Sequence, residues 1–205
     1  VDFTGQLKML YWNRQFKTPL SLASSQTLGA FHLEEGVDYG TIDSVKAYDQ
    51  KIDFWSVGGA VDWNALKQLT ITGGYWHYWA SDGNHRDKVV ARASYSITDN
   101  FLLQYRYKGI WNAKQVPQYF SPEVFNQHAF LLGYADSFWD SVRVKLMAGP
   151  VWQDDGFQKS TGALEDVRVT WRFLELWSLT AHLEADQVGS GYQYLYSTLA
   201  LTRDF

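Results

Sequence analysis

Positively charged side chains recur at alternate positions within several short segments of the chain. In the segment 101–111, which reads FLLQYRYKGIW, Gln104, Arg106 and Lys108 alternate with aromatic and aliphatic residues. Guanidinium and ammonium groups bind carboxylates, and an amide can hydrogen-bond beside them. If the segment is a strand, these three side chains share one face. The polar alternate positions of all such segments predict a solute-binding set that comprises Lys8, Arg92, Gln104, Arg106, Lys108, Arg143, Lys145, Arg168, Arg172, His182 and Glu184, with Asp62, Asp166 and Asp186 beside them.

The same residues support a second interpretation, because the set contains acids as well as bases. Arginines, lysines and carboxylates on one face can pair with one another and brace the interior without binding any solute. The sequence leaves open which of these side chains bind a solute and which only pair.

Composition excludes several other kinds of chemistry. The chain has 205 residues, with 22 acidic and 18 basic side chains and a formal net charge of -4. A nucleic-acid-binding protein would carry a strong basic excess, so we expect no nucleic-acid partner. Cysteine is absent and the five histidines are scattered, so we expect neither a metal site nor a cofactor.

Alternation with a period of two residues runs through most of the chain and predicts strands. It is clear in 55–63, 69–76, 89–97, 101–111, 142–152, 167–173 and 177–186. In the less regular part we predict two strands, 26–35 and 40–48, around a turn at 36–39. No apolar run approaches the roughly 18 residues of a transmembrane helix. We therefore predict an all-β fold, an antiparallel up-and-down sheet of about 12 strands, as a single domain over 1–205.

The connections and the aromatic residues indicate where this sheet lies. Short connections such as 98–100 and 174–176 alternate with longer ones such as 81–87, 113–124 and 154–160. Aromatic side chains gather at the ends of the apolar faces, as in Trp55, Trp63, Trp111 and Trp171. Both features are typical of transmembrane β-barrels, whose apolar face meets lipid and whose polar face lines the interior. The alternative is a soluble barrel or sandwich with the apolar face inside.

Three local patterns resemble known families. The final Phe205, preceded at alternate positions by Arg203, Leu201 and Leu199, resembles the C-terminal signature of Gram-negative outer-membrane proteins, although Arg203 departs from it. The segment 7–16, LKMLYWNRQF, looks like the first strand of the substrate-specific porins of pseudomonads. The segment 119–125, YFSPEVF, with the alternation up to Trp152, is similar to the barrel domains of exopolysaccharide exporters. These resemblances imply a protein of the bacterial outer membrane, with outer-membrane lipid around it.

The main functional hypothesis is a channel. The predicted architecture is similar to that of the twelve-stranded acidic-oligosaccharide porins, whose lumens are also basic. A narrow basic lumen would pass small anionic solutes, such as acidic sugars or carboxylates. Tyr119 and Phe120, in the loop 113–124, are expected to constrict this lumen, and Trp12, Trp76 and Tyr78 could stack on sugar rings.

Two alternatives come from other classes of protein. The first is the barrel module of a secretion or exopolysaccharide-export assembly, which would bind an envelope-assembly partner. The second is an outer-membrane hydrolase. A phospholipase-type site would use Ser81, Asn84 and His85, and an omptin-type site would use Asp154, Asp155, His182 and Asp186. Neighbours in a loop rarely position a base for a serine nucleophile, so we expect no enzyme.

Overall fold

The computed structural model describes residues 2–7, 10–12, 15–17, 20–42, 44–139, 141–188 and 192–203. Within these ranges, no helix is long and apolar enough to span a membrane. The one helix among the described residues is α1 (Val45–Asp49). The strands are β1 (Asp2–Leu7), β2 (Leu10–Trp12), β3 (Gln15–Lys17), β4 (Leu20–Leu28), β5 (Phe31–Thr41), β6 (Asp53–Leu66), β7 (Leu69–Ala80), β8 (His85–Ser96), β9 (Phe101–Asn112), β10 (Val124–Phe138), β11 (Val142–Asp154), β12 (Lys159–Leu174), β13 (Trp177–Val188) and β14 (Tyr192–Arg203).

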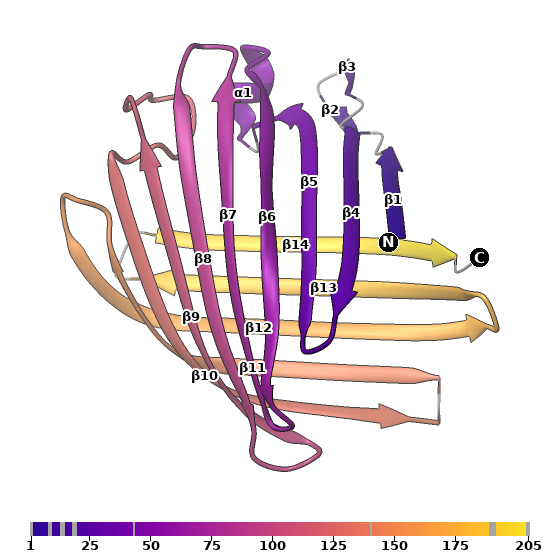
Figure 1. Cartoon of the computed structure of the whole chain (residues 1–205). Coiled ribbons are helices and arrows are strands. Elements are labelled where there is room, and N and C mark those ends of the chain that lie inside the picture. The colour runs from indigo at the N-terminus through magenta and orange to yellow at the C-terminus, as the bar shows by residue number, and fades with distance from the viewer. Residues whose placement is uncertain are drawn as a thin grey trace. The chain divides into compact units, whose positions relative to one another are not determined.

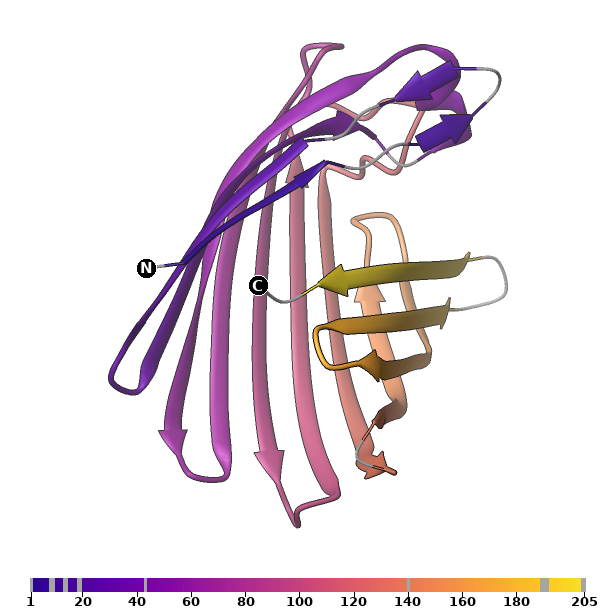
Figure 2. The same ribbon diagram turned by 90° about the vertical axis from the view of Figure 1, so that its right-hand side faces the viewer.

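Twelve of these strands form one sheet in the order β1-β4-β5-β6-β7-β8-β9-β10-β11-β12-β13-β14, and β2 and β3 pair separately (Figure 1). Neighbours along the chain are thus neighbours in the sheet, which is an up-and-down arrangement. The connections at 29–30, 67–68, 97–100 and 175–176 have two to four residues, and those at 42–52, 81–84, 113–123 and 155–158 have four to eleven, so the predicted alternation is clear only for part of the chain. In the first part of the chain, α1 and the β2–β3 hairpin lie at the strand ends that carry the longer connections (Figure 2).

The predicted turn at 36–39 is wrong. Gly36 lies in the middle of β5, and the turn lies at Gly29, whose φ of +60° suits a residue without a Cβ, and at Ala30. The range 40–48 contains the end of β5 and most of α1 rather than a strand. Gly36 marks a close approach of backbones, because a Cβ there would lie 3.0 Å from the Leu22 carbonyl oxygen. The sheet still has the predicted twelve strands, because β4 (Leu20–Leu28), which the sequence did not predict as a separate strand, takes the place of the strand predicted at 40–48.

The chain forms two compact units. The first contains Val1–Arg92, Tyr107–Asn126 and Asp154–Phe157, and the second contains Ala93–Arg106, Gln127–Gln153 and Gln158–Phe205. β8, β9, β10 and β11 contribute residues to both units. A single domain over the whole chain stays a prediction.

The two faces of the sheet differ in the way the alternation predicts. We call the face with the buried side chains the inner face and the opposite one the outer face. In β10, Gln127, Ala129 and Leu131 on the inner face are buried, whereas Phe130 and Leu132 on the outer face are 54% and 55% exposed. Trp55, Trp63 and many other large apolar side chains are exposed as well. The apolar face is therefore the outer face, as expected of a sheet that meets lipid.

The inner face of the second unit is less polar than the sequence predicts. A layer of apolar side chains on β10 to β13 packs together there, with Leu102 of β9 against it: Ala129, Leu131, Met147, Val151, Leu164 and Val188. These residues occupy the same alternate positions as the polar ones on their strands. The inner face therefore combines an apolar core with a polar patch, and the polar patch forms the candidate site.

Candidate solute-binding face

Arg106 is the centre of the polar patch in the second unit. Its Nη2 lies 2.6 Å from Asp166 Oδ2 on β12, and its Nη1 lies 3.4 Å from Glu184 Oε2 on β13. Because β10 and β11 lie between β9 and β12 in the sheet, the side chain crosses the inner face above Met147, whose sulfur is 3.4 Å from Nη2. Asp166 is only 9% exposed. A buried carboxylate of this kind needs its cationic partner, because burying an unpaired charge is costly.

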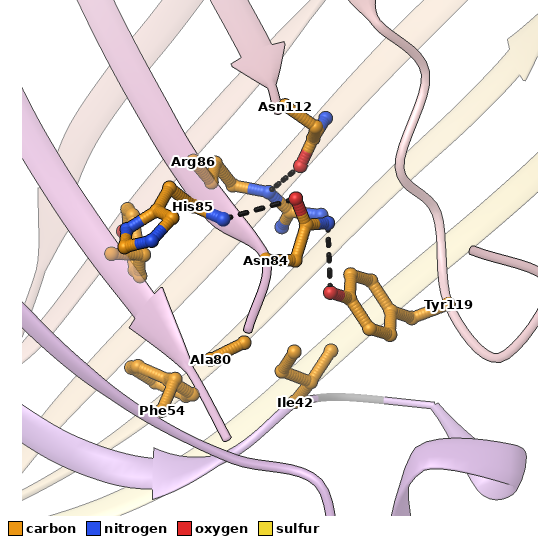
Figure 3. Close-up of a pocket in the computed structure, with 9 residues that line it drawn as sticks. Ile42, Phe54, Ala80, Asn84, His85, Arg86, Asn112 and Tyr119 are labelled. Atoms are coloured by element: carbon orange, nitrogen blue, oxygen red, sulfur yellow. Dashed lines mark hydrogen bonds between the residues drawn. The ribbon is translucent and has the colours of Figure 1, made fainter. Parts of the chain in front are cut away.

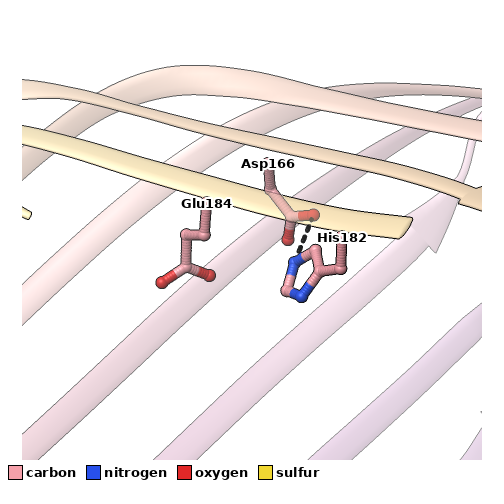
Figure 4. Close-up of side chains that lie close together, drawn as sticks. All are labelled: Asp166, His182 and Glu184. Carbon is pink, nitrogen blue, oxygen red and sulfur yellow. Dashed lines mark hydrogen bonds and ion pairs between the residues drawn. The ribbon is translucent and has the colours of Figure 1, made fainter. Parts of the chain in front are cut away.

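Asp166 is shared with a second group. His182 Nε2 lies 3.2 Å from Asp166 Oδ1 (Figure 4). The β12–β13 register pairs Asp166 with Glu184 and Arg168 with His182, so the imidazole reaches its acid diagonally across the two strands. One ligand atom each from Asp166, His182 and Glu184 lies within 4.8 Å of the others, a spacing that a metal could use. The Arg106 guanidinium binds both carboxylates and supplies the positive charge that a metal would bring.

Gln104 holds Arg106 in place. Its Nε2 donates to Ser94 Oγ over 2.7 Å, and its Oε1 accepts a hydrogen bond from Arg106 Nε. The buried Gln104 amide thus links β8 to the arginine. Of the residues predicted from the sequence, the structure brings Gln104, Arg106, His182 and Glu184 together, with Asp166 between them.

The remaining cations of the second unit lie nearer the end with the short turns. Arg143 and Lys145 are near the start of β11, and Arg168 and Arg172 are near the end of β12. The Arg172 backbone N–H donates to the Ser141 carbonyl over 2.7 Å, which brings these strand ends together. Arg143, Arg168 and Arg172 are exposed, and Lys145 is half-buried. They occupy the alternate positions of the inner face and form a basic group outside the Arg106 network.

In the first unit the predicted cations are separate from one another. Arg92 lies 3.5 Å from Asp62 and donates from Nε to Thr72 Oγ1 over 3.2 Å, and the Thr72 hydroxyl also donates to Asp62. The Lys108 ammonium lies 5.8 Å from the centroid of the Phe125 ring. Lys8 lies outside the described residues.

Trp76 is an aromatic side chain on the inner face of β7, as the alternation predicts. Gly58 and Gly74 make room for its indole, because a Cβ on Gly74 would lie 2.6 Å from Trp76 Cη2. The Lys88 ammonium is 5.6 Å from the ring centroid. Tyr78 follows on the same face and lines a cavity. The structure does not describe the side chain of Trp12.

The two aromatic residues of the loop 113–123 have different environments. Tyr119 is buried against Ala47 and Ile52, and its hydroxyl donates to Asp82 Oδ2 over 3.0 Å. Burial raises the pKa of the Tyr119 phenol, so the hydroxyl keeps its proton and remains a donor. Phe120 is 41% exposed, with its ring edge-to-face to Phe125 at 5.2 Å. Constriction of a lumen by this loop stays a prediction.

Ser81 and His85, two of the residues considered for a phospholipase-type site, contact other groups. Ser81 Oγ accepts from the Asp53 N–H over 3.1 Å, and the His85 ring lies 5.9 Å from the His77 ring. Among the described residues, no hydrogen bond joins Ser81 to His85. His182 contacts Asp166 of its neighbouring strand, as described above.

Two polar residues of the first unit, Asn84 and Arg86, are missing from the solute-binding set predicted from the sequence. Asn84 is buried and bonds the backbone of His85 and Lys114, and Arg86 donates to Asn112. The signal for Arg86 was present, because it stands on β8 at the same alternate positions as Arg92. Asn84 lies in a connection, where no periodic pattern distinguishes it from its neighbours.

Comparisons with known proteins define the fold. No protein-family model and no curated protein matches the chain. Among solved structures, a "Bacterial polysaccharide outer membrane secretin" is 12% identical, with a TM-score of 0.74 over 98% of this chain and 74% of that one. A "KdgM porin in complex with disordered oligogalacturonate" is 13% identical, with a TM-score of 0.56 over 92% and 93% of the two chains.

The fold is thus that of the β-barrels of the bacterial outer membrane. This confirms the predicted class, an antiparallel up-and-down transmembrane β-barrel of about 12 strands. At these identities the likeness is one of fold.

Proposed function

We propose that the chain is an outer-membrane channel that passes small saccharides and prefers those with a carboxylate. The observation that supports this most is the inner face of the second unit, where a fixed polar network adjoins an exposed group of cations. Two of the structures with a similar fold have names that mention a polysaccharide and an oligogalacturonate. A saccharide is therefore the first solute to test.

The charges of this face decide where the preference for anions arises. Arg106 is paired with Asp166 and Glu184, so its charge is compensated. The preference therefore rests on the exposed residues Arg143, Arg168 and Arg172. Exposed charges act over a Debye length of about 8 Å at physiological salt, and walls of low dielectric constant focus their field.

Planar-bilayer recordings of the purified chain test the proposal. In a KCl gradient, the reversal potential should show a preference for chloride over potassium. Combined replacement of Arg143, Arg168 and Arg172 by glutamine should reduce this preference, whereas Lys46→Gln, which removes an exposed cation from α1, should preserve it. Absence of conductance would contradict a channel, and a preference for potassium would contradict the basic lumen.

A second candidate function is the barrel module of a polysaccharide-export assembly. It is favoured by the match to the polysaccharide secretin, which has a higher TM-score and covers more of this chain than the match to the porin does. Liposomes that contain the chain can be loaded with a short and a long acidic polysaccharide. A channel for small solutes should release only the short one, whereas an export module would also release the long polymer, alone or after its envelope partner is added.

A further inference from the structure

A cavity lies at the long-loop end of the first unit, apart from the Arg106 network. It has a volume of about 100 Å³ and lies between β6, β7, β8 and the loop 113–123 (Figure 3). Ile42, Phe54 and Tyr78 form its apolar side, and Arg86, Asn112 and Tyr119 form its polar side. None of these residues is in the solute-binding set predicted from the sequence, although Tyr78 is predicted to stack on sugar rings and Tyr119 to constrict the lumen.

Arg86 brings an uncompensated positive charge to this cavity. Its Nε donates to Asn112 Oδ1 over 2.8 Å, its Nη2 donates to the Phe120 carbonyl, and its guanidinium carbon lies 5.5 Å from the Tyr119 ring centroid. These partners are all neutral. Among the described residues, no carboxylate forms an ion pair with Arg86, and none accepts from its Nη1. Since a half-buried charge is stabilised by an opposite charge, the cavity favours an anion.

The acidic side chains near the cavity are engaged elsewhere. Asp82 accepts from the Asn84 backbone N–H over 2.9 Å and from the Tyr119 hydroxyl over 3.0 Å. Asp38 accepts from the Ser56 hydroxyl over 3.2 Å. Neither side chain forms an ion pair with Arg86, so the guanidinium remains available to an external acid.

The wall of the cavity is fixed before any ligand binds. The amide of Asn84 donates to the Lys114 carbonyl over 3.0 Å and to the Tyr119 oxygen over 2.9 Å. Its Oδ1 accepts from the backbone N–H groups of His85 and Lys114. The buried Asn84 side chain therefore uses its full hydrogen-bonding capacity. A site held in this way loses little entropy when it binds a ligand.

The size and lining of the cavity restrict the anion. A volume of about 100 Å³ is smaller than that of a cavity of about 150 Å³ that binds benzene, which suits a carboxylate group and the part of a ring next to it. The rings of Phe54 and Tyr78, 5.5 Å apart, provide an aromatic surface beside it. Such a surface can contact the C–H face of a sugar ring. The geometry points to a subsite for the carboxylate of an acidic sugar, an inference that rests on the proposed function and assigns one site to it.

Calorimetric titration of the detergent-solubilised chain with galacturonate, galactose and acetate tests the inference. Galacturonate should bind best, because galactose lacks the carboxylate and acetate lacks the ring. Arg86→Gln should weaken galacturonate binding by about tenfold or more, the effect of losing a charge-assisted hydrogen bond. Lys67→Gln, which removes an exposed cation from the turn 67–68, should leave binding unchanged.

A second variant tests the inference even if Arg86→Gln does not fold. Ala80→Leu fills the cavity and leaves Arg86 in place, and it should also weaken galacturonate binding. Equal binding of galactose or acetate, or unchanged binding in both cavity variants, would overturn the inference. If the chain binds galacturonate in a way that depends on Arg86 but shows no conductance, the proposed channel function is contradicted and the proposed subsite is supported. If it shows anion-selective conductance but no such binding, the subsite is contradicted and the channel function is supported.

Discussion

Replacement of Arg106 by glutamine should destabilise the barrel, because Asp166 would lose its main partner. Loss of one member of a buried ion pair costs about 3–5 kcal/mol of unfolding free energy. Here Arg106 is 24% exposed, and His182 would remain 3.2 Å from Asp166. Both facts lower the cost, and we expect about 2–3 kcal/mol. The double variant Arg106→Gln with Asp166→Asn should recover part of this loss, because the charge of the buried Asp166 side chain is removed together with its main partner.

Urea unfolding of the chain in lipid vesicles, followed by tryptophan fluorescence, measures this difference. Arg92→Gln is the matched control, because Arg92 and Asp62 lie 3.5 Å apart with side chains that are 43% and 34% exposed. An exposed pair of this kind is worth about 1 kcal/mol or less. If Arg106→Gln costs no more than Arg92→Gln, the Arg106 network is a solvated surface contact and our account of it is wrong.

Three further variants test other parts of the structure. Asn84→Ala should cost about 1–3 kcal/mol, because it leaves buried backbone groups without partners, and limited proteolysis should then cut the loop 113–123 faster than in the parent chain. Leu132→Arg, on the outer face, should cost about 2–4 kcal/mol in vesicle unfolding if Leu132 lies at the bilayer midplane, and no loss of stability would contradict the assignment of the faces. Gly58→Val should displace the Trp76 indole and shift its fluorescence, since a Cβ on Gly58 meets both the Tyr75 carbonyl and that indole, and an unchanged spectrum would argue against this packing.

The sequence predicted most of the strands, because alternation is a local property. In 101–111 the aromatic residues lie on the outer face, and Gln104 and Arg106 lie on the inner face, as the pattern predicts. The prediction failed at Gly36, because a glycine in a turn and a glycine at a close strand contact look alike in sequence. The sequence did not predict β4 as a strand of its own, and its bounds became clear only from its pairing with β5 in the structure.

The partners of the charged side chains could not be predicted in the same way. Alternation places Arg106, Asp166 and Glu184 on one face, but it does not say that β9 reaches β12 and β13 across two other strands. That contact depends on how the sheet of the second unit bends. Asn84 and Arg86 form a site only through their contacts with Lys114 and Phe120 of the loop 113–123, and alternation does not predict how a loop packs.

The reach of Arg106 has a consequence for the order in which the barrel folds. Its two acids are 60 and 78 residues further along the chain. A contact over such a separation forms after the hairpins between its ends, because closing a long loop costs entropy that local pairing must first repay. We therefore expect the network to be absent from the transition state for folding. Interactions of this kind leave the folding rate almost unchanged and slow unfolding, so Arg106 should determine how long the inserted barrel persists more than how quickly it assembles.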